Sequence, residues 1–225
     1  MDWSPILISM KTASVSIVLT FFLGILAAWW VVSMKNERMK ILLDGVLTLP
    51  LVLPPTVAGF FLLYLFGVKR PIGIFFLQYF GVKIAFSWTA TVLAAVVMSF
   101  PLMYRSARGA FEQVDPNLMA AARTLGMSEW SIFYKVLIAN AMPGIVSGGV
   151  LAFARGLGEF GATAMIAGNI AGKTRTLPMA VYSEVAAGNM DAAYRYVAII
   201  VVIAFLSVIL MNRAALKESK KRGQF

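Results

Sequence analysis

The chain alternates long apolar stretches with short polar segments that are mostly basic. An α-helix rises 1.5 Å per residue, so about 20 apolar residues cross the roughly 30 Å hydrocarbon core of a bilayer. The pattern therefore predicts an all-α, polytopic transmembrane helical bundle, with residues 1–225 forming one transmembrane domain. The expected spans, about five in number, are 13–32, 45–66, 84–104, 136–157 and 196–211.

The second apolar stretch contains Pro50, Pro54 and Pro55. Proline lacks an N–H and clashes with the preceding turn, so this helix must be kinked or interrupted. Lipid does not satisfy the carbonyls that such a break frees, and we therefore expect the break to face protein or a water-filled path. Pro54 and Pro55 are candidate pathway residues for this reason.

Two shorter segments do not fit a full span. The aromatic stretch 67–83 predicts a short interfacial helix. A helix over about 178–187 would be only ~15 Å long, too short for the hydrocarbon core. We interpret it as re-entrant or interfacial, and the pattern over 162–193 leaves open whether that region spans the membrane. In the fourth span, small residues recur at every fourth position and predict close helix packing: Gly144, Gly148, Ala152 and Gly156.

The segment 105–135 separates the third and fourth spans and contains a predicted helix–turn–helix. Asp115 is a good N-cap and Pro116 suits the first helical position. Gly126 supplies a left-handed stop, and a second helix is expected over 128–135. The first helix carries small and apolar residues at helical spacing, which we expect to form one face: Leu118, Ala121, Ala122 and Leu125.

Composition supports a membrane protein, since 60% of the residues are hydrophobic and only 13% are charged. The net charge of +10 is not read as a nucleic-acid signal, because Lys and Arg lie beside the apolar spans and suit anionic membrane lipid. Loops on the side of 105–135 hold 12 basic residues and those on the other side hold 7. The positive-inside rule then places 105–135 and the C-terminus in the cytoplasm and the N-terminus outside.

The residue inventory argues against catalysis by this chain. Cys and His are absent, and no phosphate-binding loop or nucleophile–base arrangement occurs, so neither an enzyme nor a metal or cofactor site is predicted. Arg155 and Glu159 stand four residues apart at the end of the fourth span, and Thr163 follows them. The charged pair either neutralises itself for packing or lines a transport path or its outer gate.

Two stretches together resemble a known family. The run Ala-Ala-Ala-Arg-Thr-Leu-Gly at 120–126 is similar to the cytoplasmic "EAA" loop of permease subunits in binding-protein-dependent ABC importers. The run at 153–163 and the segments 169–170 and 174–178 look like the oxyanion permeases of that group, mainly those for molybdate, with sulfate and tungstate permeases close by. The matching proline motifs lie at 49–57 and 99–102.

The resemblance implies the type I importer permease fold and a membrane subunit that works with other proteins. It implies two copies of this chain in the inner or plasma membrane, a dimer of separate ATPase subunits, and a periplasmic or lipid-anchored protein that delivers the oxyanion. A stand-alone secondary anion transporter is the alternative from another class. The ATPase would dock on the loop through Leu118, Ala120, Ala121, Ala122, Leu125 and Gly126, with Ala120 standing where the family has Glu.

Overall fold

The computed structural model describes residues 2–221, and every regular element in that part of the chain is a helix. The prediction of an all-α architecture is confirmed. The helices are α1 Ser4–Val32, α2 Glu37–Val52, α3 Pro55–Phe66, α4 Pro71–Phe80, α5 Trp88–Glu112, α6 Pro116–Thr124, α7 Glu129–Ile132, the π-helical η1 Phe133–Ile138, α8 Ala139–Leu157, α9 Gly161–Ala167, α10 Leu177–Ala186 and α11 Met190–Lys221.

Four helical segments in the described part are long and apolar enough to cross a membrane, and α2 with α3 gives a fifth if the broken pair is one span. The helix direction bends by 111° at the break between α2 and α3. The expectation of about five spans, one of them interrupted, is therefore confirmed. The segment from Glu129 to Leu157, which comprises α7, η1 and α8, is the candidate for the fourth span.

Several helix boundaries differ from the sequence prediction. α1 begins at Ser4, nine residues before the expected start at position 13. α5 continues to Glu112, so the first eight residues of the expected loop are helical and Pro101 lies inside the helix. The helix expected over 128–135 is not separate, because α7 continues through η1 into α8. No glycine or proline stands between Glu129 and Ile138 to stop the helix.

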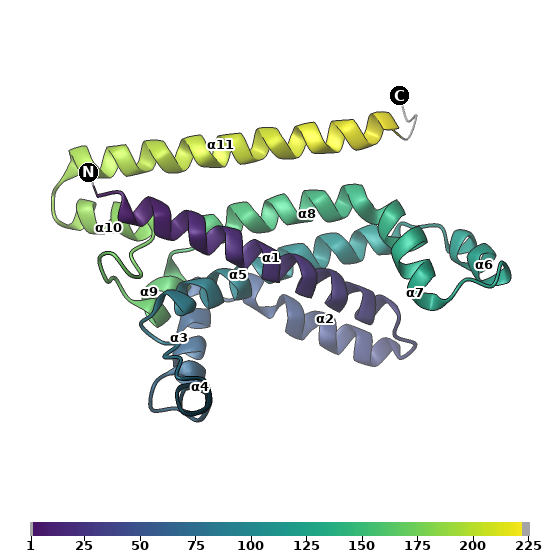
Figure 1. Ribbon diagram of the computed structural model, residues 1–225, viewed down its shortest axis with the longest axis horizontal. Coiled ribbons are helices and arrows are strands. Elements are labelled where there is room, and N and C mark those ends of the chain that lie inside the picture. The colour runs from purple at the N-terminus through teal and green to yellow at the C-terminus, as the bar shows by residue number, and fades with distance from the viewer. Residues whose placement is uncertain (1, 222–225) are drawn as a thin grey trace.

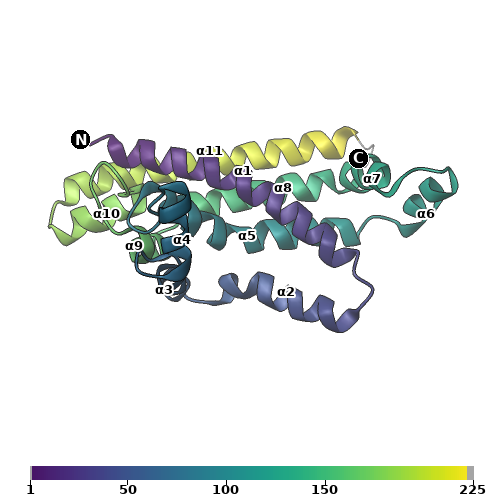
Figure 2. The ribbon, with the colours of Figure 1, turned by 60° about the horizontal axis from the view of Figure 1, so that its bottom comes forward.

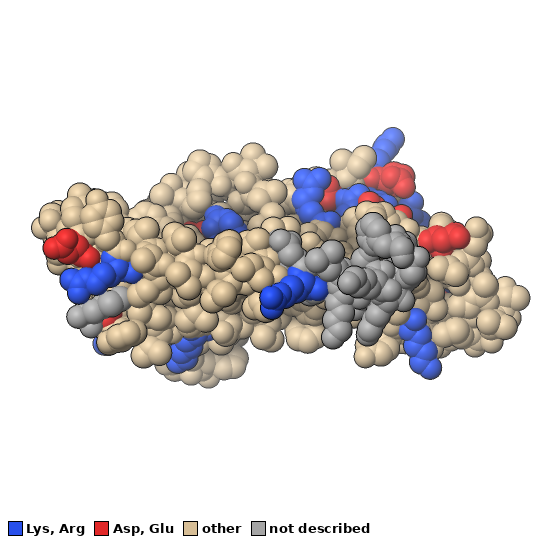
Figure 3. Space-filling model, turned by 90° about the horizontal axis from the view of Figure 1, so that it is seen from above, with Lys and Arg blue, Asp and Glu red and all other residues tan. Residues whose placement is uncertain are grey.

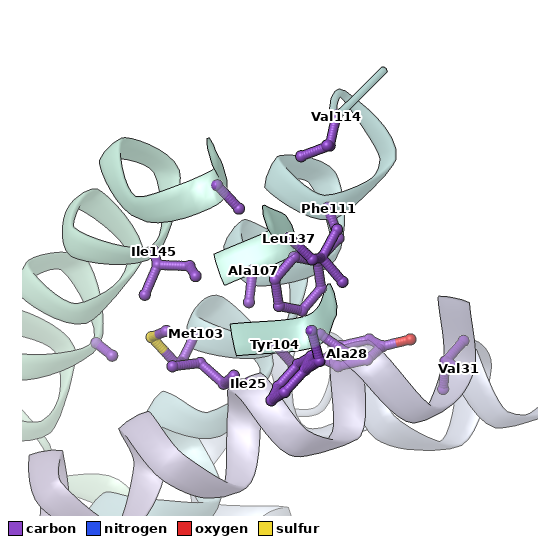
Figure 4. Packing of buried hydrophobic residues seen from close by; sticks show 13 residues of the cluster. Ile25, Ala28, Val31, Met103, Tyr104, Ala107, Phe111, Val114, Leu137 and Ile145 are labelled. Carbon is purple, nitrogen blue, oxygen red and sulfur yellow. The ribbon is translucent and has the colours of Figure 1, made fainter. Parts of the chain in front are cut away.

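The core lies where α1, α5 and α8 pack together (Figure 4). Met103 and Tyr104 of α5 are fully buried there, beside Ile25 and Ala28 of α1 and Ile145 of α8. Aliphatic and aromatic side chains from three helices thus fill one common space. These contacts make the three-helix unit a closely packed core of the molecule.

The small-residue seam predicted for α8 is confirmed. A Cβ built on Gly144 would come 2.6 Å from Cβ of Ala110 in α5, which is closer than two carbon atoms can approach. Gly148 meets Ser106 of the same helix in a similar way. Glycine at these positions lets the two helix backbones approach closely.

Hydroxyl groups between α1 and α5 form a second seam that the sequence reading missed. Thr12 and Thr91 lie 2.9 Å apart, and Thr20 and Ser99 lie 3.1 Å apart, each pair joined by a buried hydrogen bond. The Trp88 indole N–H also donates to the Thr12 hydroxyl at 3.0 Å. Such bonds hold helices together in surroundings that offer no water as a competing partner.

The helices give the molecule two distinct ends. α6 lies beyond one end of the bundle, whereas α3, α4, α9 and α10 gather at the other (Figures 1 and 2). On the face seen in Figure 3, charged side chains lie at both ends, and further basic side chains lie along the middle of the molecule. The candidate coupling residues and the candidate pathway residues therefore occupy opposite ends.

Candidate coupling helix and pathway site

α6 begins and ends as the sequence predicts. The Asp115 carboxylate accepts a hydrogen bond from the backbone N–H of Asn117 at 2.9 Å and caps the first turn. At the other end, Gly126 has φ of +75°. The N–H of Met127 donates to the Ala122 carbonyl at 3.1 Å, which closes the glycine turn known as a Schellman motif.

The outer face of α6 differs from the predicted one at a single residue. Leu125 is 81% exposed and Leu118 is 46% exposed, and Ala120 and Ala121 are exposed as well. Ala122 is only 4% exposed. Ala122 therefore does not contribute to the exposed surface of α6 in the single chain.

Helical spacing explains why Ala122 is buried. Ala122 stands three residues after Met119, which packs against the core cluster around Phe133. The Met119 contact attaches α6 to the rest of the chain. The residues of the predicted docking set that remain exposed are Leu118, Ala120, Ala121, Leu125 and Gly126.

An ion pair that the sequence reading missed links α6 to α7. The Arg123 guanidinium donates to both carboxylate oxygens of Glu129, with Nε–Oε1 at 2.7 Å and Nη2–Oε2 at 3.1 Å. Hydrogen bonding to Glu129 raises the pKa of Arg123. This bidentate pair spans the turn at Gly126, so the hairpin has an internal salt bridge although Ala120 carries no charge.

The break in the second span lies between Val52 and Pro55. Because Pro54 and Pro55 have no N–H, the carbonyls of Pro50 and Leu51 receive no helical hydrogen bond from four residues ahead. Helical hydrogen bonding resumes at Pro54, whose carbonyl accepts a hydrogen bond from the N–H of Ala58 at 3.1 Å. Pro54 itself is exposed on the surface of this single chain.

Arg155 and Glu159 form the predicted pair. Arg155 Nη1 lies 2.6 Å from Glu159 Oε2, and the Glu159 side chain is 1% exposed while that of Arg155 is 28% exposed. α8 ends at Leu157, so Glu159 lies past the helix end. Its second oxygen accepts from the backbone N–H of Ala162 at 2.7 Å. Glu159 thus joins the last turn of α8 to the first turn of α9, a role that spacing alone did not reveal.

The break between α2 and α3 lies against the connection between α8 and α9. A Cβ on Gly161 would lie 2.9 Å from Cβ of Pro55, and one on Gly59 would lie 2.6 Å from Cα of Ala162. α3 therefore packs directly on α9, where Thr163 is 1% exposed. The fold brings Pro55, Glu159 and Thr163 into one neighbourhood at the end of the bundle opposite α6.

The family of this chain follows from its sequence match. Residues 20–220 match the model of the family described as binding-protein-dependent transport system inner membrane component. The chain belongs to this family. It is therefore an inner membrane component of a transport system, and its partners in that system are a substrate-binding protein and a separate ATPase. The permease itself is not an enzyme.

Relatives of this permease cover nearly its whole length. It is 43% identical over 224 residues to the molybdenum transport system permease protein ModB of Escherichia coli (strain K12), covering 99% of this chain and 97% of the relative. It is 39% identical over 225 residues to the protein of the same name from Haemophilus influenzae, covering 100% and 98%.

Solved structures share the permease fold. A chain of the MetNI methionine ABC transporter in an inward-facing conformation matches with a TM-score of 0.74 at 17% identity, covering 95% of this chain and 94% of that one. A chain of a bacterial ABC transporter involved in the import of the acidic polysaccharide alginate matches with a TM-score of 0.78 at 13% identity, covering 95% of this chain and 78% of that one. These likenesses confirm the predicted ABC importer permease fold.

Among the described residues, no group of three or more acidic, His or Cys side chains could hold a metal ion.

Proposed function

We propose that this chain is the membrane-spanning subunit of an ATP-driven importer of molybdate. The observation that carries the proposal is the 43% identity over 224 residues with a permease named for molybdenum transport. Sulfate or tungstate as the delivered anion is the nearest alternative. In such a system the delivering protein selects the anion, while this chain supplies the path and the coupling to ATP hydrolysis.

The exposed face of α6 is the proposed docking surface for the ATPase. Leu118, Ala121 and Leu125 offer a small apolar surface that suits insertion into a groove. ATP binding would draw the two ATPase subunits together and move α6. Because α6 is fixed to α7 by Arg123 and Glu129, its motion reaches α8 through a continuous helix. ATP thereby biases the permease between an outward-open and an inward-open state.

Two copies of this chain would enclose the anion path, with the α2–α3 break facing that path or the second copy. α2 has no buried residue in the single chain, and the unbonded carbonyls of Pro50 and Leu51 need protein or water around them. Pro54 and Pro55 then border the path or the dimer interface. Arg155, Glu159 and Thr163 lie next to this break and are proposed to line the path or its outer gate.

The proposed orientation places α6 and the C-terminus in the cytoplasm and the N-terminus outside. The distribution of 12 and 7 basic residues supports it. The periplasmic or lipid-anchored binding protein would then dock at the end formed by α3, α4, α9 and α10.

The test is reconstitution of the permease with its ATPase and binding protein in lipid vesicles. Molybdate bound to the binding protein should stimulate ATP hydrolysis and accumulate inside the vesicles. Stimulation of ATP hydrolysis by sulfate in place of molybdate would reassign the substrate. Tungstate is tested in the same way, and stimulation by tungstate alone would reassign the substrate to tungstate. Anion uptake by this chain alone, without ATPase or ATP, would instead favour a secondary transporter and overturn the importer proposal.

A further inference from the structure

A cluster of charged and polar side chains joins α2 to α5 at the α6 end of the bundle. Arg108 is ion-paired with Asp44 and lies 2.9 Å, Nε to Oε1, from Glu112. The Tyr104 hydroxyl donates to Asp44 at 2.9 Å, and Lys40 Nζ lies 3.9 Å from Glu112. We call these five residues the α2–α5 clasp.

The clasp is an important attachment of α2. No residue of α2 is buried, and only Leu43 and Leu47 pack partly against the core cluster. The side chains of Asp44 and Arg108 are only 27% and 22% exposed, so their pairing is less screened than that of a surface pair. Arg108 forms ion pairs with the carboxylates of both Asp44 and Glu112, which gives a network rather than an isolated pair.

The clasp also lies between the two regions of proposed function. Glu112 is the last residue of α5, and Asp115, which caps α6, follows three residues later. At the far end of α2 the chain breaks at Leu53 and Pro54. A displacement of α6 therefore reaches α5 directly and can reach the break through α2, provided that α2 moves with α5.

We infer that the clasp makes α2 move together with α5, so that Asp44, Arg108 and Glu112 act as positioning residues for coupling. This inference rests on the proposed importer function. Motion of α6 passes along α5, across the clasp into α2, and on to the α2–α3 break beside the candidate path. The clasp touches neither the anion nor the nucleotide, and its effect is on uptake per ATP rather than on binding of either.

The absence of cysteine from this chain allows a direct test. In the reconstituted complex, Asp44→Cys/Arg108→Cys removes the clasp, and a short bifunctional thiol reagent then replaces it with a covalent link. Before linking, uptake per ATP should fall by about fivefold or more, the usual lower range of coupling between sites. After linking, it should return toward the value of the unmodified complex.

Two results would overturn the inference. Normal uptake per ATP in the unlinked variant would make the clasp irrelevant to coupling, and failure of the linked protein to recover would indicate that α2 must slide along α5. Arg108→Gln with Arg105→Gln gives a matched comparison, since Arg105 lies one turn away on the same helix and forms none of the ion pairs found among the described residues. Only Arg108→Gln should lose coupling.

The unmodified complex separates this inference from the proposed function. If it shows no anion-stimulated ATP hydrolysis, the importer proposal fails. If it is active and Arg108→Gln and Arg105→Gln behave alike, the clasp inference fails. Thermal unfolding of each purified variant shows whether a loss of coupling reflects misfolding, and the linked double variant tests the inference with both charges absent.

Discussion

Gly126 is required by backbone conformation rather than by lack of space. A Cβ at this position would meet no atom within 4 Å, but φ is +75°. The left-handed conformation costs a residue with a β-carbon about 1–2 kcal/mol, and Asn tolerates it better than Val. Gly126→Val should therefore weaken ATPase co-purification more than Gly126→Asn, with insertion and expression unchanged. Equal recovery of ATPase with both variants would contradict this account.

Arg155 is predicted to compensate the buried charge of Glu159. Arg155→Ala leaves a carboxylate that is 1% exposed without its cation, which should destabilise the protein by about 3 kcal/mol. Adding Glu159→Gln removes the charge but keeps an oxygen that accepts from the Ala162 N–H, so the double variant should regain most of the loss. Thermal unfolding in detergent measures both values.

Transport by the same double variant decides the role of this pair. A stable double variant that no longer transports would place Arg155 and Glu159 on the anion path. Full transport would limit the pair to a structural role in joining α8 to α9.

At the scale of elements, α6 has an exposed face, which is the proposed docking surface, and a buried side at Ala122. Leu125→Glu introduces a charge on the outer face and should reduce ATPase co-purification while the permease remains stable. Ala122→Trp places a large side chain at a position that is 4% exposed. It should lower the thermal stability of the α6–α7 hairpin and also reduce ATPase co-purification. Measuring co-purification and thermal unfolding together separates the two faces. If the Ala122→Trp variant is as stable as the unmodified protein but loses ATPase co-purification, Ala122 belongs to the docking surface after all.

The whole molecule makes a prediction about topology. Met127 lies just beyond α6, whereas Arg70 immediately precedes α4 at the opposite end of the bundle (Figure 1). Single cysteines introduced at these positions should react with a membrane-impermeant thiol reagent from opposite sides, position 127 from the cytoplasm and position 70 from outside. Labelling of both from the same side would rule out the proposed arrangement of spans.

Much of this architecture was determined by local sequence. Span lengths depend only on apolar composition and helical rise, so the number of spans and the broken second span could be predicted. The ends of α6 could be predicted for a similar reason, because Asp115 and Gly126 act on the backbone within a few residues of themselves. The Arg155–Glu159 pair is also local, since its partners lie four residues apart.

The tertiary structure decided which distant residues meet. The inward turn of Ala122 depends on where Met119 finds the core, and the contact of Pro55 with Gly161 depends on how two breaks more than 100 residues apart pack. The pairing of Asp44 with Arg108 likewise joins helices that have no local relation. Helical periodicity fixes which residues share a face, but long-range packing determines what each face contacts, and for this reason the site geometry and the clasp appeared only in the folded chain.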